Sequence, residues 1–221
     1  SQVELNIAKD YAAEDADITY RLYKIFLKSL KSEKLLNIYE IFEKPLIKIL
    51  ASMEINGIKL DNNFLKKLSV KFEKKLQDLE KQIFKISKKK FNIASTKQLG
   101  EIMYNDLKIA SLKKTKKGSF ATGAAVLEDL AYKGNEFPKL VLEWRQSSKL
   151  KNTYSDSLPE HLNPNTKRVH TSFLLAATTT GRLASSDPNL QNIPIKTEEG
   201  KDIRKAFISE KNKKLISADY N

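Results

Sequence analysis

A long apolar seam between residues 61 and 90 constrains the fold more than any other feature of this sequence. Asp61 is a good helix N-cap. The apolar side chains after it recur at spacings of three and four, namely Leu65, Leu68, Phe72, Leu76, Leu79, Ile83 and Ile86. This spacing keeps one face apolar for about seven turns, or roughly 40 Å. Most lysines of the segment fall off the seam, and a solvated lysine face is the simplest interpretation of them. The sequence therefore predicts an amphipathic helix over 62–90.

A second long helix is predicted over 138–157, with Pro138 in its first turn. Between the long helices, Ser95 and Gln98 form a capping-box pattern that opens one short helix, and Thr122 is placed to cap another. The stretch between these short helices has no apolar periodicity and is predicted to be an exposed basic loop, with Lys113, Lys114, Lys116 and Lys117. This layout is typical of a helical hairpin with a compact tip.

The segments on either side of the hairpin differ in pattern. Apolar residues recur at helical spacing over 15–31 and 35–53; Pro45 predicts a kink or a new helix start, and Gly57 is placed to end the helix. After Pro159 the chain becomes rich in Thr and Val and partly alternates, which favours strands. A polar loop, a short helix near 202–205 and a short buried strand that ends at Asp219 are expected to follow.

Charge and composition narrow the class of protein. Lys and Arg total 40 against 27 Asp and Glu, a formal charge of +13. Clustered cations favour a polyanionic partner, because they release condensed counterions when they contact phosphates. An AT-rich genome also produces Lys-rich, Asn-rich and Ile-rich composition by default, so charge alone leaves both explanations open.

Several classes are excluded by what the sequence lacks. It contains no cysteine, which rules out disulfides, thiolate metal sites and cysteine nucleophiles, and its two histidines cannot form a multi-histidine metal site. No apolar run approaches the ~20 residues of a membrane helix, and the first residues lack the layout of a signal peptide. Without an initiator Met, the chain is expected to be part of a longer protein.

A series of motifs resembles the family A DNA polymerases of bacteria. In chain order they are YAAEDAD, EKPLIKILASMEINGIKLD, FNIASTKQL, LKKTKKG, EWRQSSKLKNTYSDSLP, TTTGRLASSDPNLQNIPIKTEEGKDIRKAF and SADYN. Each match is weak alone, but their order within one chain makes the resemblance specific. Asn221 stands where the family commonly has Ser.

The resemblance implies a fold and an activity. The expected fold is α+β and mostly α, with long antiparallel thumb helices and a small helical tip followed by antiparallel palm strands. Three parts are expected: a remnant of a 3′–5′ exonuclease-like domain over 1–33, a thumb with the helices that lead into it over 34–160, and part of a palm over 161–221. The implied protein is a DNA-directed DNA polymerase of replication and repair, monomeric and cytoplasmic, which binds primer–template DNA and deoxynucleoside triphosphates. The chain alone is expected to be inactive, because the fingers and the second catalytic carboxylate are not in it.

The resemblance also assigns a catalytic role to Asp219. A terminal Asp after an apolar stretch more often caps a turn. In the family, however, the matching Asp binds two Mg²⁺ ions, which stabilise the attacking and leaving oxygens of phosphoryl transfer, and the main-chain carbonyl at Tyr220 is expected to complete the shell. With its partner carboxylate missing, Asp219 is expected to bind metal poorly.

Three groups of residues are candidates for DNA contacts. Arg182, Asn189, Gln191 and Asn192 lie in one polar loop and carry donors for the acceptors that every base pair shows in the minor groove. An ordinary Asn-rich and Pro-rich turn is the alternative. The second group follows a predicted helix and comprises Arg145, Lys149, Lys151, Asn152 and Thr153; solvated helix charges are the alternative. The third comprises Asn92, Ser95, Thr96 and the four lysines of the basic loop, where hydroxyls and helix N-termini can meet phosphates.

Tyr11 and Asp15 have the spacing of the family's exonuclease motif, which places both on one helical face. They are expected to be a remnant only. His170 is expected to be structural or a neighbour of a phosphate. The alternative is a protein of a different class, a non-catalytic, basic helical module that binds nucleic acid. Such a module would have no need of the acidic SADYN motif at the end of a strand.

Overall fold

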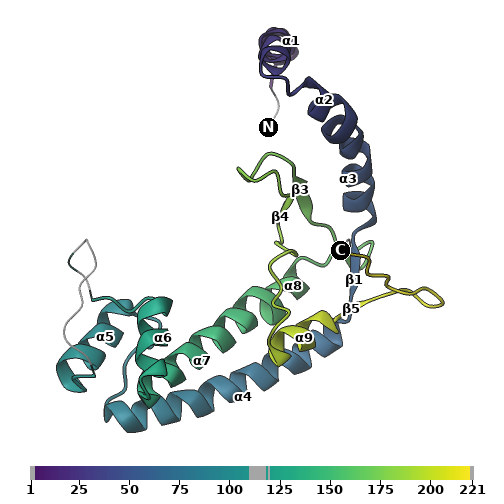
Figure 1. The fold of residues 1–221 in the computed structure, drawn as a ribbon. Coiled ribbons are helices and arrows are strands. Elements are labelled where there is room, and N and C mark those ends of the chain that lie inside the picture. Colours follow the sequence, from purple (N-terminus) through teal and green to yellow (C-terminus); the bar gives the residue numbers. More distant parts are fainter. Residues whose placement is uncertain (1–2, 110–117, 119, 220–221) are drawn as a thin grey trace. The chain divides into compact units, whose positions relative to one another are not determined.

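The chain forms two compact units in the computed structural model, which describes residues 3–109, 118 and 120–219. The first unit combines residues 1–56 with 173–184, and the second combines 57–172 with 185–221. Most elements are helices, and the strands form two small sheets (Figure 1). The predicted fold class, α+β and mostly α, is confirmed. No helix among the described residues is both long and apolar enough to span a membrane.

Helices make up most of the first unit. They are α1 (Leu5–Ser32), α2 (Leu36–Ile38), the π-helical η1 (Tyr39–Glu43) and α3 (Lys44–Asn56). Pro45 is the second residue of α3, but α2, η1 and α3 follow one another without a break, so the predicted new helix start is not found; the helix changes from π-helical to α-helical at this point instead. Gly57 ends α3 as predicted, with φ of +59°. Much of the predicted apolar stripe is exposed, including Phe26 at 58% and Phe42 at 63%.

The hairpin of the second unit forms as predicted. Helix α4 (Asn62–Ser87) and helix α7 (Glu136–Leu150) run side by side in Figure 1. The Asp61 side chain accepts a hydrogen bond from the Phe64 N–H at 2.9 Å, which satisfies one free donor of the first turn of α4. Beyond α7 the chain continues through the π-helical η3 (Lys151–Asp156) into α8 (Ser157–Glu160). The predicted helix therefore extends to residue 160, but with a π-helical stretch that its periodicity does not reveal.

The tip of the hairpin contains α5 (Thr96–Gly100), the π-helical η2 (Glu101–Asp106) and α6 (Ala124–Tyr132). Ser95 caps α5, as its Oγ accepts from the Gln98 N–H at 3.4 Å, but the Gln98 side chain accepts from the Asn92 N–H instead of completing a capping box. The predicted Thr122 cap is wrong. Gly123 is the N-cap of α6, and Thr122 is buried with its carbonyl turned to Arg145.

Two apolar cores lie along the hairpin, and α4 contributes to both. Its first half joins Leu150, Leu158 and Val169 in one core, and its second half joins Leu99 and Leu127 in the other. The seam residues from Leu65 to Ile83 are all buried. Burial of each such side chain contributes about 1.5–3 kcal/mol, so the seam fixes the face of α4 that packs on α7.

The strands are shorter than predicted. β1 (Ile58–Leu60) is the centre of an antiparallel sheet in the order β2-β1-β5, with β2 (Arg168–Val169) and β5 (Phe207–Ile208) on its two sides. β3 (Ser172–Leu174) and β4 (Ala184–Ser186) form the other sheet. Helix α9 (Glu198–Arg204) confirms the predicted short helix and is tied to α4 by the Lys75–Glu199 ion pair at 2.6 Å.

The predicted buried strand before Asp219 is wrong. Residues 214–219 form no strand, and the side chains of Leu215 and Ile216 are 56% and 90% exposed. An apolar run becomes a strand only where a neighbour accepts its backbone hydrogen bonds. The described strands pair with one another and not with this stretch.

Candidate nucleic-acid interface

A groove on the hairpin brings together residues from three separate segments of the sequence. It has a volume of about 460 Å³. We call it the hairpin groove; its lining includes Thr96, Gly123, Trp144, Arg145, Ser148, Lys149, Asn152 and Thr153. Five of these residues were predicted to contact DNA: Thr96, Arg145, Lys149, Asn152 and Thr153. Helix α6 begins at the groove, and the N-terminal end of a helix carries partial positive charge.

Arg145 lines the groove and also links two helices. One terminal nitrogen of its guanidinium donates to the Thr122 carbonyl at 2.6 Å, which holds the start of α6 against α7. Burial lowers the pKa of Arg145 from its usual value, but a guanidinium stays protonated in proteins. The groove therefore has one oriented cation, Arg145, beside the exposed cation Lys149.

The residues before α5 use their side chains locally. Asn92 Oδ1 accepts from the Ala94 N–H at 3.0 Å, and Ser95 Oγ caps the helix. These bonds fix the turn that positions the exposed Thr96 on the groove. Lys113, Lys114, Lys116 and Lys117 lie outside the described residues.

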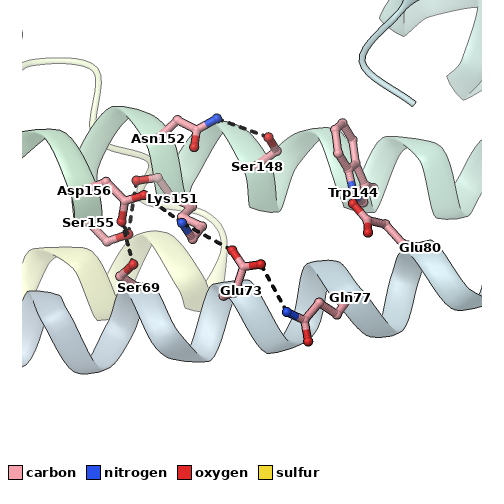
Figure 2. A network of polar contacts seen from close by, with 10 residues as sticks. All are labelled: Ser69, Glu73, Gln77, Glu80, Trp144, Ser148, Lys151, Asn152, Ser155 and Asp156. Atoms are coloured by element: carbon pink, nitrogen blue, oxygen red, sulfur yellow. Dashed lines mark hydrogen bonds and ion pairs between the residues drawn. The ribbon is translucent and has the colours of Figure 1, made fainter. Parts of the chain in front are cut away.

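Lys151 points away from the hairpin groove. Figure 2 shows its side chain directed toward α4, whereas Asn152 lies on the far side of its helix. The Lys151 ammonium contacts Asp156 at 2.8 Å and Glu73 at 3.3 Å. The hydrogen bond to Asp156 is the main cause of a raised Lys151 pKa. Burial alone would raise the pKa of Asp156, but hydrogen bonds from Lys151 and Ser69 outweigh it and lower that pKa.

A second groove adjoins the first and shares Arg145 and Lys149 with it. Its other lining residues include Gln146, Tyr154, Asn192 and Pro194. The Tyr154 hydroxyl donates to the Asn192 carbonyl at 2.5 Å. Arg204 donates to the Ile193 carbonyl at 3.0 Å, and Ile193 itself is buried. Tyr154 and Arg204 thus fix the backbone of the loop that contains Asn192 and Ile193 from two sides.

The exposed amides of the loop are carried on that fixed backbone. Asn189, Gln191 and Asn192 are all exposed, and Asn189 Oδ1 accepts from the Gln191 N–H at 3.0 Å. Arg182 belongs to the first unit, where it is exposed and its carbonyl accepts from Thr178 Oγ1 at 2.8 Å. The Asn189 side chain is itself held by this bond, so its amide can donate to an acceptor without first being ordered.

The Tyr154 hydroxyl gives a direct test of how the loop is fixed. Tyr154→Phe removes only the donor to the Asn192 carbonyl, so we expect the free energy of unfolding to fall by about 1 kcal/mol. Urea denaturation of the whole chain measures this loss. Tyr132→Phe is the matched control, because the Tyr132 side chain is 93% exposed and its substitution should change stability by less than about 0.5 kcal/mol. Equal stability of the two variants would contradict the assignment.

The remaining candidates among the described residues are exposed. Asp219 lies in the stretch that forms no strand, Tyr220 is outside the described residues, and Tyr11 and Asp15 are exposed on α1. Within the described part of the chain, no three or more Asp, Glu, His or Cys side chains are grouped so as to hold a metal ion. Mg²⁺ is usually held by one or two carboxylates together with substrate phosphates and waters, so the exposed Asp219 fits the role of one protein ligand and does not complete a site.

Comparison with known proteins identifies the family to which this chain belongs. A family model described as DNA polymerase family A matches residues 62–221, most of the chain. This chain belongs to family A of the DNA polymerases. DNA polymerase I of Rhizobium leguminosarum is 49% identical to it over 219 residues, which are 99% of this chain and 22% of that protein. DNA polymerase I of Pseudomonas aeruginosa is 45% identical over all of this chain and 24% of that protein.

A solved structure is also similar to this chain. It is the POL domain of Pol1 from M. smegmatis in complex with DNA primer-template and dNTP, with 35% identity and a TM-score of 0.74. The likeness covers 82% of this chain and 32% of that one. The chain thus spans about a quarter of the length of its curated family A relatives and about a third of the solved domain.

Sequence reasoning about this family A segment missed several groove residues, among them three of α7. Trp144 and Ser148 line the hairpin groove, and Gln146 lines the adjoining one. Ser148 is three residues after Arg145 and four before Asn152, so helical spacing alone could have found it. Trp144 donates to Glu80 at 3.0 Å (Figure 2), and the sequence carries no signal for that partner.

Proposed function

We propose that this chain is the primer–template-binding part of a DNA-directed DNA polymerase that works in bacterial DNA replication and repair. One observation carries the proposal: the hairpin groove gathers Arg145, Lys149, Asn152 and Thr153 with Thr96, which is 49 residues or more away along the chain. Two cations, an amide and hydroxyls along one groove are suited to a phosphate backbone. The complex described for the M. smegmatis relative supports the same class of ligand.

The fixed loop supplies a second kind of contact. We propose that Asn189, Gln191 and Asn192, together with Arg182, donate to the acceptors of the minor groove. These acceptors are similar in every base pair, so binding of this kind does not depend on sequence. Such indifference is what a polymerase needs in order to copy any template.

We propose that nucleotide addition also needs residues that lie outside this chain. Family A polymerases use Mg²⁺, and Asp219 would supply one carboxylate to the catalytic centre of the complete polymerase. Because the chain spans about a quarter of its curated relatives, the nucleotide-binding residues and the other carboxylate would come from the rest of the protein. The segment alone should therefore bind DNA and not extend a primer.

Duplex binding by the whole chain tests the proposal. The affinity for a fluorescently labelled primer–template duplex should fall as salt rises, with a slope of log affinity against log salt of about −0.9 for each phosphate contacted. Fluorescence anisotropy between low and physiological salt measures the slope. Duplexes of unrelated sequence should bind within about twofold of one another, since phosphates carry no sequence information.

A variant with Lys113, Lys114, Lys116 and Lys117 all replaced by Ala should give a flatter slope. Binding that does not depend on salt, or that depends strongly on sequence, would contradict the proposal.

A further inference from the structure

The π-helical stretch η3 contains two of the residues that line the hairpin groove. Helix α7 is α-helical up to Leu150, and η3 then runs from Lys151 to Asp156. A π-helix bonds each carbonyl to the N–H five residues on, so it adds a residue to the turn and changes the direction of the side chains after it. Asn152 and Thr153 lie within this stretch and line the groove.

An ion pair within η3 matches the π-helical geometry. The Lys151 ammonium contacts Asp156 Oδ2 at 2.8 Å, five residues along the chain. In a regular α-helix, residues five apart point about 140° away from each other. A π-helical turn brings them near the same side, so the pair stabilises the π-helix and would be lost if the stretch reverted to an α-helix.

The pair is also fastened to α4. Ser69 Oγ donates to Asp156 Oδ1 at 2.6 Å, and Glu73 contacts the Lys151 ammonium at 3.3 Å. The Lys151 side chain is only 18% exposed, so water competes little for it. Figure 2 shows these four side chains meeting between the two helices, with Asn152 on the opposite side of η3.

We propose that Asp156 is a positioning residue for DNA binding. By holding Lys151 and Ser69 with its two oxygens, it keeps η3 π-helical and thereby keeps Asn152 and Thr153 on the hairpin groove. Lys151 then serves the same network and adds little to the attraction for phosphate, since two carboxylates neutralise its charge. This inference rests on the proposed function and assigns a role to residues that do not line the groove.

Electrostatic attraction and side-chain positioning predict opposite changes in DNA affinity for the substitution Asp156→Asn. Asp156→Asn removes a negative charge and weakens the hold on Lys151, so electrostatics alone would make duplex DNA bind more tightly. An Asn side chain has one acceptor oxygen where Asp has two. With that oxygen facing Lys151, the ion pair becomes a weaker hydrogen bond to a neutral acceptor and the Ser69 hydroxyl faces the NH₂ group, so positioning predicts that the affinity falls by roughly threefold to tenfold.

Fluorescence anisotropy with a labelled primer–template duplex measures the affinity of the whole chain and of its variants, and so distinguishes a gain of affinity from a loss. Ser69→Ala leaves every charge in place and should weaken binding by about twofold. Asp78→Asn is the matched control: Asp78 is an exposed carboxylate of α4 in contact with Lys81, and its loss should leave affinity unchanged or slightly raised. Circular dichroism identifies a temperature at which all the variants are folded.

A double-mutant cycle separates positioning from general loss of structure. In a background of Asn152→Ala and Thr153→Ala, the effect of Asp156→Asn should shrink to less than twofold, because the side chains that it positions are gone. Hydrogen exchange of the η3 amides, measured without DNA, should be faster in Asp156→Asn than in the parent.

Two results would overturn the inference: duplex affinity of Asp156→Asn equal to or above that of the parent, or an undiminished loss in the double-alanine background. Failure of the proposed function is seen separately, in the parent chain, as absent or salt-independent binding.

Discussion

In a complete polymerase that contains this segment, Asp219→Asn is expected to lower the rate of nucleotide addition by on the order of a thousandfold. The substitution keeps the shape of the side chain and removes its charge. Asp219 is exposed and belongs to neither apolar core, so the change should leave the fold intact. An interaction that matters only in the transition state appears as a loss of rate without a loss of binding. Primer–template affinity should therefore stay within about twofold of the parent.

Single-turnover primer extension measures the rate, and anisotropy measures the affinity. Glu160→Gln is a suitable control, because Glu160 is an exposed carboxylate at the end of α8 that lines neither groove. Arg182→Ala should behave differently from Asp219→Asn: extension slows and becomes more sensitive to a mismatch at the primer end. A near-parental rate for Asp219→Asn would show that the catalytic assignment is wrong.

The second large effect is expected in DNA binding by the segment itself. Arg145→Ala combined with Lys149→Ala should weaken duplex binding by roughly thirtyfold at low salt and make the salt slope less negative by nearly two units. Both side chains line both grooves, so they are the cations that a phosphate backbone can reach from either side. Anisotropy across a salt series gives both quantities.

A charge-matched control separates this local effect from net charge. Lys74→Ala with Lys139→Ala removes the same charge from exposed positions that line neither groove. This double variant should lose less than about threefold in affinity, because exposed charges beyond a Debye length are screened. Equal losses in the two double variants would mean that the grooves are not the binding site.

Features that depend on neighbouring residues could be predicted from the sequence. The seam of α4, its Asp61 cap and the end of α3 at Gly57 all follow from helical spacing or from the conformational limits of one residue. The motif order was enough to identify the family, which the family model then confirmed. The helix features are local, so the physical reason for each lies within a few residues of it.

Features that depend on a distant partner could not be predicted in this way. Thr122 has the side chain of a cap, yet Arg145, 23 residues on, draws its carbonyl to α7. The apolar stretch before Asp219 has the composition of a strand but no paired neighbour among the described strands. The domain limits expected from the family remain predictions.

The sequence by itself determined the hairpin, its tip and the family, because helical periodicity, capping and motif order are written in consecutive residues. Only the tertiary structure decided which basic residues share a groove. Helical spacing already places Lys149 and Lys151, two residues apart, on different faces. The tertiary structure adds that Lys151 lies against the carboxylates of Glu73 and Asp156 while Lys149 is exposed at the groove. Asp156 is only five residues from Lys151, but Glu73, which contacts the same ammonium from α4, is 78 residues away in sequence, and a pattern of neighbouring residues carries no information about a contact that packing alone creates.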